Sequence, residues 1–217
     1  MTIHTFYLLI FYVSLSVTLI AAYISVSNRD RAVRPMVALV WTSAIFDLTL
    51  GISADIFNYY IPYVGYFYRI IEFLIIIEFY FSFLQKKIHR HFSRIIQVLI
   101  PMTFILFFEW SSSYFRLLNS IIFCLAPIAL YFHNFKTLSF GNILESPVFW
   151  ANTAIFIYFS GNLFLFLMFK SIASSDKDIA LASYCLHNGL LITRNVVLAI
   201  SFIKSKNIGV RTYARNS

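Results

Sequence analysis

The chain has 217 residues, of which 60% are hydrophobic and 12% are charged, with 17 Lys and Arg against 9 Asp and Glu. A soluble domain carries roughly 25% charged residues, so this composition excludes an ordinary water-soluble protein and predicts a membrane protein. The length accommodates about seven helices of ~21 residues with short connections, which leaves no room beside them for a soluble catalytic domain.

Apolar windows predict seven transmembrane helices in one all-α polytopic bundle. The first and sixth are the clearest, because no charged residue interrupts 6–26 or 149–169. Only Ser111, Ser112 and Ser113 separate the fourth from the fifth, so an alternative is that these two form a re-entrant pair. In chain order the predicted spans are residues 6–26, 36–57, 66–85, 95–110, 114–133, 148–171 and 180–204.

Basic residues predict the orientation of the bundle. Twelve of the 17 Lys and Arg follow the first, third, fifth and seventh spans, whereas Arg116 and Lys177 lie in the opposite loops. The positive-inside rule then places the amino terminus outside and the carboxyl terminus in the cytoplasm. We predict a single transmembrane domain over residues 1–204, followed by a basic cytoplasmic tail over 205–217.

The remaining composition points to lipid contact rather than to nucleic acid or metal. The basic run KKIHRHFSR at 86–94 favours lipid headgroups, with docking of a cytoplasmic partner as the alternative. Nucleic-acid binding is not expected, because the basic residues are spread over four short segments. Cys124 and Cys185 lie inside apolar stretches and are interpreted as packing residues. No metal or cofactor is predicted, since His187 is the single histidine well inside a span.

Charged and polar side chains inside the predicted spans are the candidate functional residues. A charge at the bilayer centre costs about 2.5–3.5 kcal/mol on insertion scales, so each should face a neighbour or a cavity. Counting at ~1.5 Å per residue sorts them into two layers. The outer layer, roughly 8–10 Å deep by this count, contains Glu72, Asn119, Asn162 and His187. The deeper layer, at roughly 17–21 Å, contains Asp47, Glu78 and Arg194.

These depths predict specific neighbours. Arg194 is expected to pair with Glu78 or Asp47, the two acids at its own depth. His187 lies seven residues before Arg194 and therefore on nearly the same helix face, with Asn195 in an adjacent polar row.

The predicted ligand-binding residues are Glu72, Asn162, His187 and Arg194, because carboxylate, amide, imidazole and guanidinium groups are costly in lipid if they serve packing alone. Simple interhelical hydrogen bonding, worth ~0.6 kcal/mol on average, is the competing interpretation and is favoured for Asn119. The predicted supporting residues are Asp47, Arg69, Glu78, Asn119 and Asn195.

Three segments resemble a family of seven-span membrane proteins from Bacteroidota. They are RIIEF at 69–73, FW followed by IYFSGNLFLF within 149–166, and LHN followed by RN in the last span, with YFSGNLFLF the most specific. The resemblance covers most of the chain from the third span onward. It implies a multi-pass protein of the bacterial inner membrane whose relatives accompany signalling proteins, and it implies no established activity.

Two functions are compatible with these residues. The first is a receptor or sensor component that binds a small or lipid-like ligand in an outward-facing polar pocket and acts through a cytoplasmic-side or membrane partner. The alternative is an intramembrane lipid-modifying hydrolase or transferase that uses His187 and Glu72 as acid and base. Ser160 in YFSGN is interpreted as a packing residue rather than a nucleophile. The sequence predicts neither the ligand nor the oligomeric state.

Overall fold

The computed structural model describes residues 3–28, 30–55, 64–82, 108–137, 140–172 and 177–216, and four isolated positions between 95 and 102. Within these ranges every regular element is a helix and no strand occurs, which confirms the all-α class. The elements are α1 (Ile3–Ser25), α2 (Arg34–Asp55), α3 (Val64–Phe81), α5 (Phe108–Thr137), the short 3-10 helix η1 (Phe140–Glu145), α6 (Pro147–Ile172) and α7 (Lys177–Asn216).

Local sequence explains where two of these helices begin. Pro35 is the second residue of α2 and Pro147 the first of α6, positions that suit proline because the first helical N–H groups have no partner within the helix. The turn before α2 is held by side-chain acceptors. Asn28 Oδ1 accepts the Asp30 N–H at 2.9 Å, and Asp30 Oδ1 accepts the Ala32 N–H at 2.9 Å.

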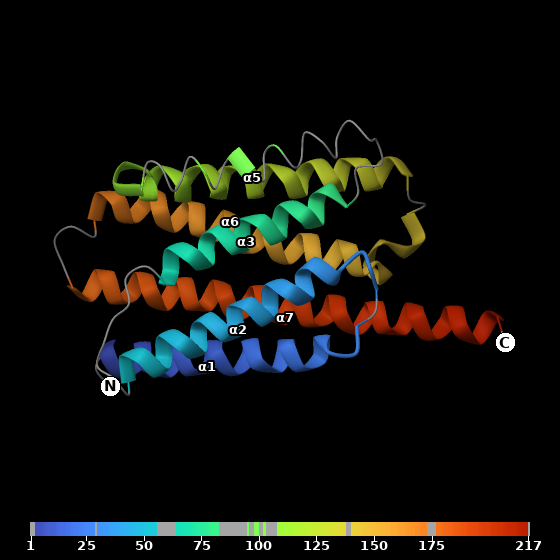
Figure 1. Ribbon diagram of the computed structural model, residues 1–217, viewed down its shortest axis with the longest axis horizontal. Coiled ribbons are helices and arrows are strands. Elements are labelled where there is room, and N and C mark those ends of the chain that lie inside the picture. Colours follow the sequence, from blue (N-terminus) through green and yellow to red (C-terminus); the bar gives the residue numbers. More distant parts are fainter. Residues whose placement is uncertain are drawn as a thin grey trace.

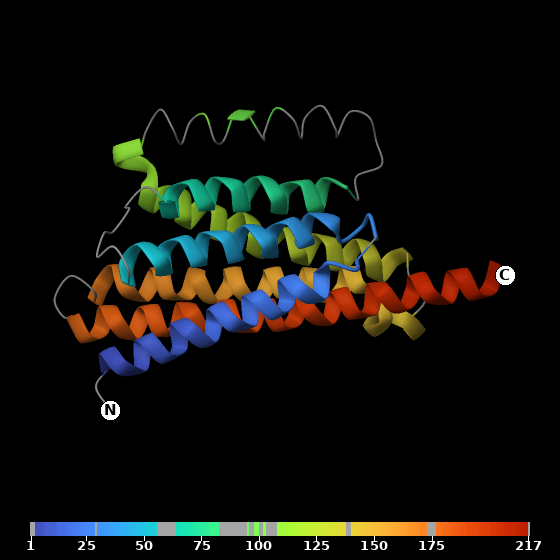
Figure 2. The ribbon, with the colours of Figure 1, turned by 60° about the horizontal axis from the view of Figure 1, so that its bottom comes forward.

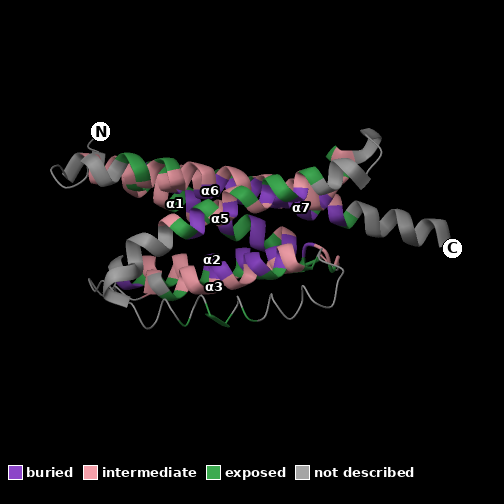
Figure 3. Ribbon diagram, turned by 90° about the horizontal axis from the view of Figure 1, so that it is seen from above, coloured by how far each residue is buried: buried purple, intermediate pink, exposed green. Residues whose placement is uncertain are grey.

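The helices run along one long axis: α1, α3, α5 and α7 point in one direction, and α2 and α6 point in the opposite one (Figures 1 and 2). Helix α7 packs against both α1 and α6, α5 packs against α6, and α2 packs against α1 and α3. Buried residues lie where helices face one another (Figure 3). Three buried rings join the outer helices to this core: Phe123 of α5 lies 5.5 Å from Phe73 of α3 and 4.8 Å from Phe159 of α6, between ring centroids.

A glycine in the YFSGN segment of α6 lies against a side chain of α7. A Cβ added at Gly161 would clash with the side chain of Leu190 on α7. Gly189, one residue earlier on α7, has open space around the equivalent position. A side chain at the α6 glycine would therefore require Leu190 to change its conformation, whereas one at Gly189 would not.

Four of the described helices are long and apolar enough to cross a membrane, through Thr5–Ser25, Arg34–Ser53, Pro147–Met168 and Ile179–Lys206. Large apolar side chains point outward from them: Tyr23 is 81% exposed and Ile20 58%. A soluble protein rarely exposes apolar side chains so densely, and a lipid environment accounts for them. Helix α3 has the length of 18 residues but includes Arg69, Glu72 and Glu78.

The boundary predicted between the fourth and fifth spans is wrong. Helix α5 begins at Phe108 and continues without interruption through Ser111, Ser112 and Ser113. Serine is only a weak helix breaker, so three serines do not end a helix in the way that Pro or Gly would. Most of the predicted span 95–110 and the basic run 86–94 lie outside the described residues.

One end of the bundle is marked by the extension of α7, which continues as a helix to Asn216 beyond the other helices (Figures 1 and 2). Ser205 Oγ on this helix lies 3.1 Å from both Asn28 Oδ1 and Asp30 Oδ2, which share its single hydroxyl hydrogen, and this contact fixes α7 to the turn between α1 and α2. Ser201 donates to the Pro147 carbonyl at 2.6 Å and fixes it to the start of α6. The predicted tail from residue 205 is thus a continuation of α7.

Candidate functional site

The centre of the bundle holds a buried ion pair between α7 and α3. Arg194 is 1% exposed and Glu72 3%, and Arg194 Nη1 lies 2.8 Å from Glu72 Oε1. The expectation that Arg194 pairs with Glu78 or Asp47 was therefore wrong about the partner. A depth counted along the backbone neglects the tilt of the helices and the length of the arginine side chain. The guanidinium therefore reaches Glu72, a carboxylate that the count had assigned to the outer layer.

A closed ring of hydrogen bonds surrounds this pair. Arg194 Nη2 donates to Ser43 Oγ of α2 at 2.8 Å, and Ser43 Oγ lies 2.6 Å from Tyr68 Oη of α3. Tyr68 Oη donates to Glu72 Oε1 at 3.1 Å, which Arg194 Nη1 also contacts. Because a hydroxyl has one hydrogen, these roles require Ser43 to donate to Tyr68, so the ring runs in one direction from guanidinium to carboxylate.

Arg194 also connects the two helices that flank the ring. Its Cζ lies 4.6 Å from the centroid of the Tyr158 ring on α6, a cation–π contact. Its Nε donates to Asn195 Oδ1 at 3.2 Å, and Asn195 Nδ2 donates to Thr18 Oγ1 of α1 at 2.6 Å. Arg194 and its neighbour thereby reach α1, α2, α3 and α6, all from one turn of α7.

A second polar pair lies nearer the amino-terminal end of α7. His187 Nδ1 is 2.8 Å from Asn162 Oδ1 of α6, and Asn162 Nδ2 donates back to the Tyr158 carbonyl at 2.8 Å. The rings of His187 and Tyr158 are 6.0 Å apart between centroids. Both His187 and Asn162 are half-buried. Tyr158 therefore lies between this pair and Arg194 and contacts both.

The structure brings the predicted ligand-binding residues together as two linked clusters, one with Glu72 and Arg194 and one with Asn162 and His187. Glu72 Oε1 is bound by Arg194 and Tyr68, while His187 Nδ1 is bound to Asn162. The side chains thus contact partners on neighbouring helices, which is the arrangement that interhelical hydrogen bonding predicts. A groove of about 640 Å³ lies elsewhere, between the start of α2 and the end of α3.

The predicted supporting residues have different surroundings. Asn195 belongs to the Arg194 cluster, and Asp47 is near enough to interact electrostatically with Arg194 and Glu72. Arg69 interacts with Glu72 in the same way. Glu78 is exposed and lines the groove between α2 and α3.

Asn119 lies apart from these contacts, on α5. It is 5% exposed, and among the described residues its Oδ1 accepts no hydrogen bond.

Sequence reasoning missed several participants. Ser43, Thr18 and Tyr158 stand in apolar runs without any spacing that distinguishes them from packing residues. Tyr68 was not among the predicted residues either, and its hydroxyl belongs to the Arg194 ring. Ser160 donates to the Ile157 carbonyl of its own helix at 3.2 Å, in keeping with a packing role.

Among the described residues, no group of three or more His, Cys, Asp or Glu side chains is arranged to hold a metal ion. Comparisons of the chain with protein-family models, with curated proteins and with solved structures gave no match. The site's chemistry therefore has to be inferred from its own geometry.

Proposed function

We propose that the chain is a receptor or sensor component of the bacterial inner membrane, a seven-span protein with its amino terminus outside and its carboxyl terminus in the cytoplasm. Four described helices of membrane-spanning length and composition support the multi-pass assignment. The basic residues that follow alternate predicted spans support the orientation. The bacterial source and the association with signalling are part of the proposal and come from the expected resemblance of YFSGNLFLF to the Bacteroidota family.

The observation that carries the sensor role is the position of Arg194 on α7. Its guanidinium contacts Ser43, Glu72 and Tyr158 on three other helices. Helix α7 then continues without a break to Asn216. A rearrangement of the polar contacts around Arg194 would therefore shift one continuous helix at its far end. Shifts of about 1–2 Å at helix interfaces are a common means of switching.

The ligand enters, in this proposal, from the outer side and competes for the His187–Asn162 pair. Both side chains are half-buried, and they lie roughly 10 Å from Arg194 along α7, toward its amino-terminal end. The pair offers a donor, an acceptor and a titratable ring to a small or lipid-like molecule. Tyr158, which contacts both clusters, would transmit the change to Arg194. In this proposal a membrane or cytoplasmic partner responds to the position of α7.

The alternative of a lipid-modifying enzyme has weaker support. An acid and a base must act on one reacting group, yet the Glu72 carboxylate is bound by Arg194 and the His187 ring by Asn162. Both side chains would have to leave their partners before they could share a substrate.

The coupling can be tested by spin labels at two exposed positions, 82 directly after α3 and 206 on α7, in a background where Cys124 and Cys185 are replaced by Ala. Arg194→Lys and His187→Ala should each shift the distance distribution by about 1–2 Å or broaden it, as expected of an interface shift. Ser160→Ala is the matched control, because among the described residues the Ser160 hydroxyl bonds to its own helix alone. Unchanged distributions in both folded variants would contradict the proposal.

Ligand binding can be tested independently by native mass spectrometry of protein extracted in mild detergent from its own membrane. A small molecule retained by the wild-type protein should be lost from His187→Ala and kept by Ser160→Ala, because only His187 belongs to the proposed entry pair. An adduct that survives His187→Ala unchanged would remove this pair from the binding site.

A further inference from the structure

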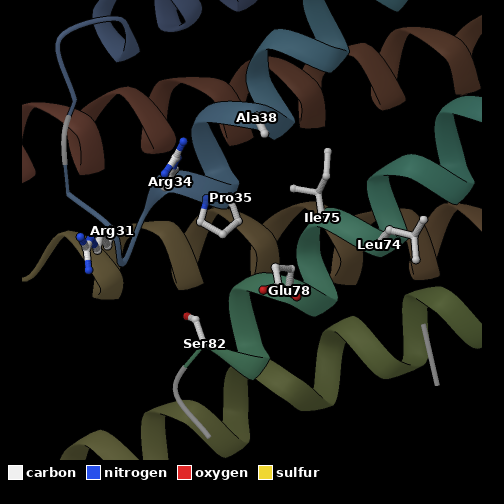
Figure 4. A pocket seen from close by; sticks show the side chains of 8 residues that line it. All are labelled: Arg31, Arg34, Pro35, Ala38, Leu74, Ile75, Glu78 and Ser82. Carbon is white, nitrogen blue, oxygen red and sulfur yellow. The ribbon is translucent and has the colours of Figure 1, made fainter. Parts of the chain in front are cut away.

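The groove between α2 and α3 separates polar from apolar lining residues along the helix axes (Figure 4). Its polar residues, Arg31, Arg34, Glu78 and Ser82, lie where α2 begins and α3 ends. Its apolar residues lie further along the two helices, toward the middle of the bundle: Pro35, Ala38, Leu74 and Ile75. Ala38 is one turn beyond Arg34, and Leu74 is one turn before Glu78, so both walls change from polar to apolar in the same direction.

This arrangement matches an amphipathic molecule that lies parallel to the helices. A membrane lipid has its headgroup at the membrane surface and its chains toward the centre, which is the same order along the same axis. The groove has a volume of about 640 Å³ and is open to the outside of the bundle, so a lipid can enter it from the side. Arg31, Arg34, Glu78 and Ser82 are all exposed, so a headgroup can reach them.

The charged side chains of the groove indicate which kind of lipid headgroup would fit it. Two guanidinium groups in one groove favour a phosphate, which arginine binds through paired charge-assisted hydrogen bonds. Glu78 in the same groove would repel a purely anionic headgroup but attract an ammonium group beside the phosphate. A carboxylate has about four lone-pair sites, so Glu78 can accept an ammonium N–H alongside its other contacts.

We propose that this groove is a binding site for a phospholipid whose headgroup carries both a phosphate and a primary amine, such as phosphatidylethanolamine. The phosphate contacts Arg31 and Arg34, the ammonium contacts Glu78, and an acyl chain lies against Ala38, Leu74 and Ile75. This site is separate from the Arg194 and His187 clusters. It depends on the membrane assignment but not on the sensor role.

The test is native mass spectrometry of the full-length protein titrated in mixed micelles with phosphatidylethanolamine or with phosphatidylglycerol, which lacks the amine. The wild-type protein should bind phosphatidylethanolamine more tightly. Arg34→Gln should weaken that binding by about tenfold, the loss expected for one charge-assisted hydrogen bond. Glu78→Gln should weaken phosphatidylethanolamine and strengthen phosphatidylglycerol, since the substitution removes both an attraction and a repulsion.

Lys206→Gln is the matched control, because Lys206 is an exposed cation at the same end of the bundle and lies outside the groove. An equal loss in Lys206→Gln and Arg34→Gln would mean diffuse surface attraction and would overturn the proposal. Complete competition by millimolar inorganic phosphate would identify a free-phosphate site and would overturn it as well. Equal binding of the two lipids, unaffected by Glu78→Gln, would exclude recognition of the amine.

Discussion

Arg194 is the residue on which the interior of this bundle depends. Removing a guanidinium and a carboxylate from water costs several kcal/mol per ion, and the pair recovers this only when its other hydrogen bonds are satisfied. Here Arg194 donates to Glu72, Ser43 and Asn195, and Glu72 also accepts from Tyr68. An apolar core would be equally stable without such a network. The network therefore matters most through the cost of leaving one of its ions without a partner.

The first prediction compares two carboxylates of the same helix. Glu72→Gln leaves the guanidinium of Arg194 buried without a counter-charge, and we expect a loss of about 3–5 kcal/mol in the free energy of unfolding. Glu78→Gln removes an exposed carboxylate and should change it by less than about 0.5 kcal/mol. Thermal unfolding in detergent, followed by circular dichroism, measures the difference. Equal midpoints for the two variants would mean that the Arg194–Glu72 pair contributes nothing to stability.

The second prediction separates stability from function at the same pair. The double variant Glu72→Leu/Arg194→Met removes both charges together, so no uncompensated ion remains. We expect it to recover most of the stability lost in Glu72→Gln, but to show the altered distance between positions 82 and 206 described above. A double variant less stable than Glu72→Gln would show that the hydrogen-bonded ring itself holds the helices together.

At the scale of elements, the interface between α6 and α7 is the part of the fold that the sequence marks most specifically. Gly161 permits close approach, Asn162 bonds to His187, and Tyr158 lies against Arg194, all within two turns of α6. Small residues allow the backbones of two membrane helices to approach closely. Such packing matters because burying apolar side chains away from lipid does little to favour helix association. The YFSGN segment is therefore explained by the partner helix it meets.

The third prediction tests that interface with two glycines. Gly161→Ala forces the Leu190 side chain to move, and overpacking of this kind costs about 1–3 kcal/mol. Gly189→Ala meets open space and should leave stability unchanged or raise it by up to about 1 kcal/mol, because alanine favours helix. Chemical unfolding of both variants in the same detergent measures the contrast. A destabilised Gly189→Ala beside an unaffected Gly161→Ala would mean that the two helices pack with another register.

Apolar windows predicted α1, α2, α6 and α7 well, because an apolar stretch long enough to span a membrane forms a helix and its ends give the approximate bounds of that helix. Equal depth also predicted correctly that Asn162 and His187 lie near each other. The depth count did not predict that Glu72 pairs with Arg194, because it assigned the two residues to different layers. A long side chain and tilted helices bring them into contact. The roles of Ser43 and Tyr158 require knowledge of which helices are neighbours, and the spacing of residues along one chain does not contain it.

At the scale of the whole molecule, basic residues from segments far apart in the sequence lie at the same end of the bundle. Ser205 binds the turn of Asn28 and Asp30, so Lys204 and Lys206 of α7 lie at the same end of the bundle as Arg31 and Arg34. Helix α3 begins at the opposite end (Figure 1). Basic residues gathered at one end of a membrane bundle favour a cytoplasmic location for that end.

The last prediction is that positions 64 and 206 face opposite sides of the membrane. In a background with Cys124 and Cys185 replaced by Ala, a cysteine at Val64 should react with a membrane-impermeant maleimide added to spheroplasts. A cysteine at Lys206, which is exposed near the carboxyl-terminal end of α7, should react only in inverted vesicles. The positive-inside rule requires this order because the neighbouring basic side chains resist transfer across the membrane. Labelling of position 64 solely from the cytoplasmic side would reverse the orientation. It would also turn the His187–Asn162 pair toward the cytoplasm, so that any ligand of this pair would arrive from inside the cell.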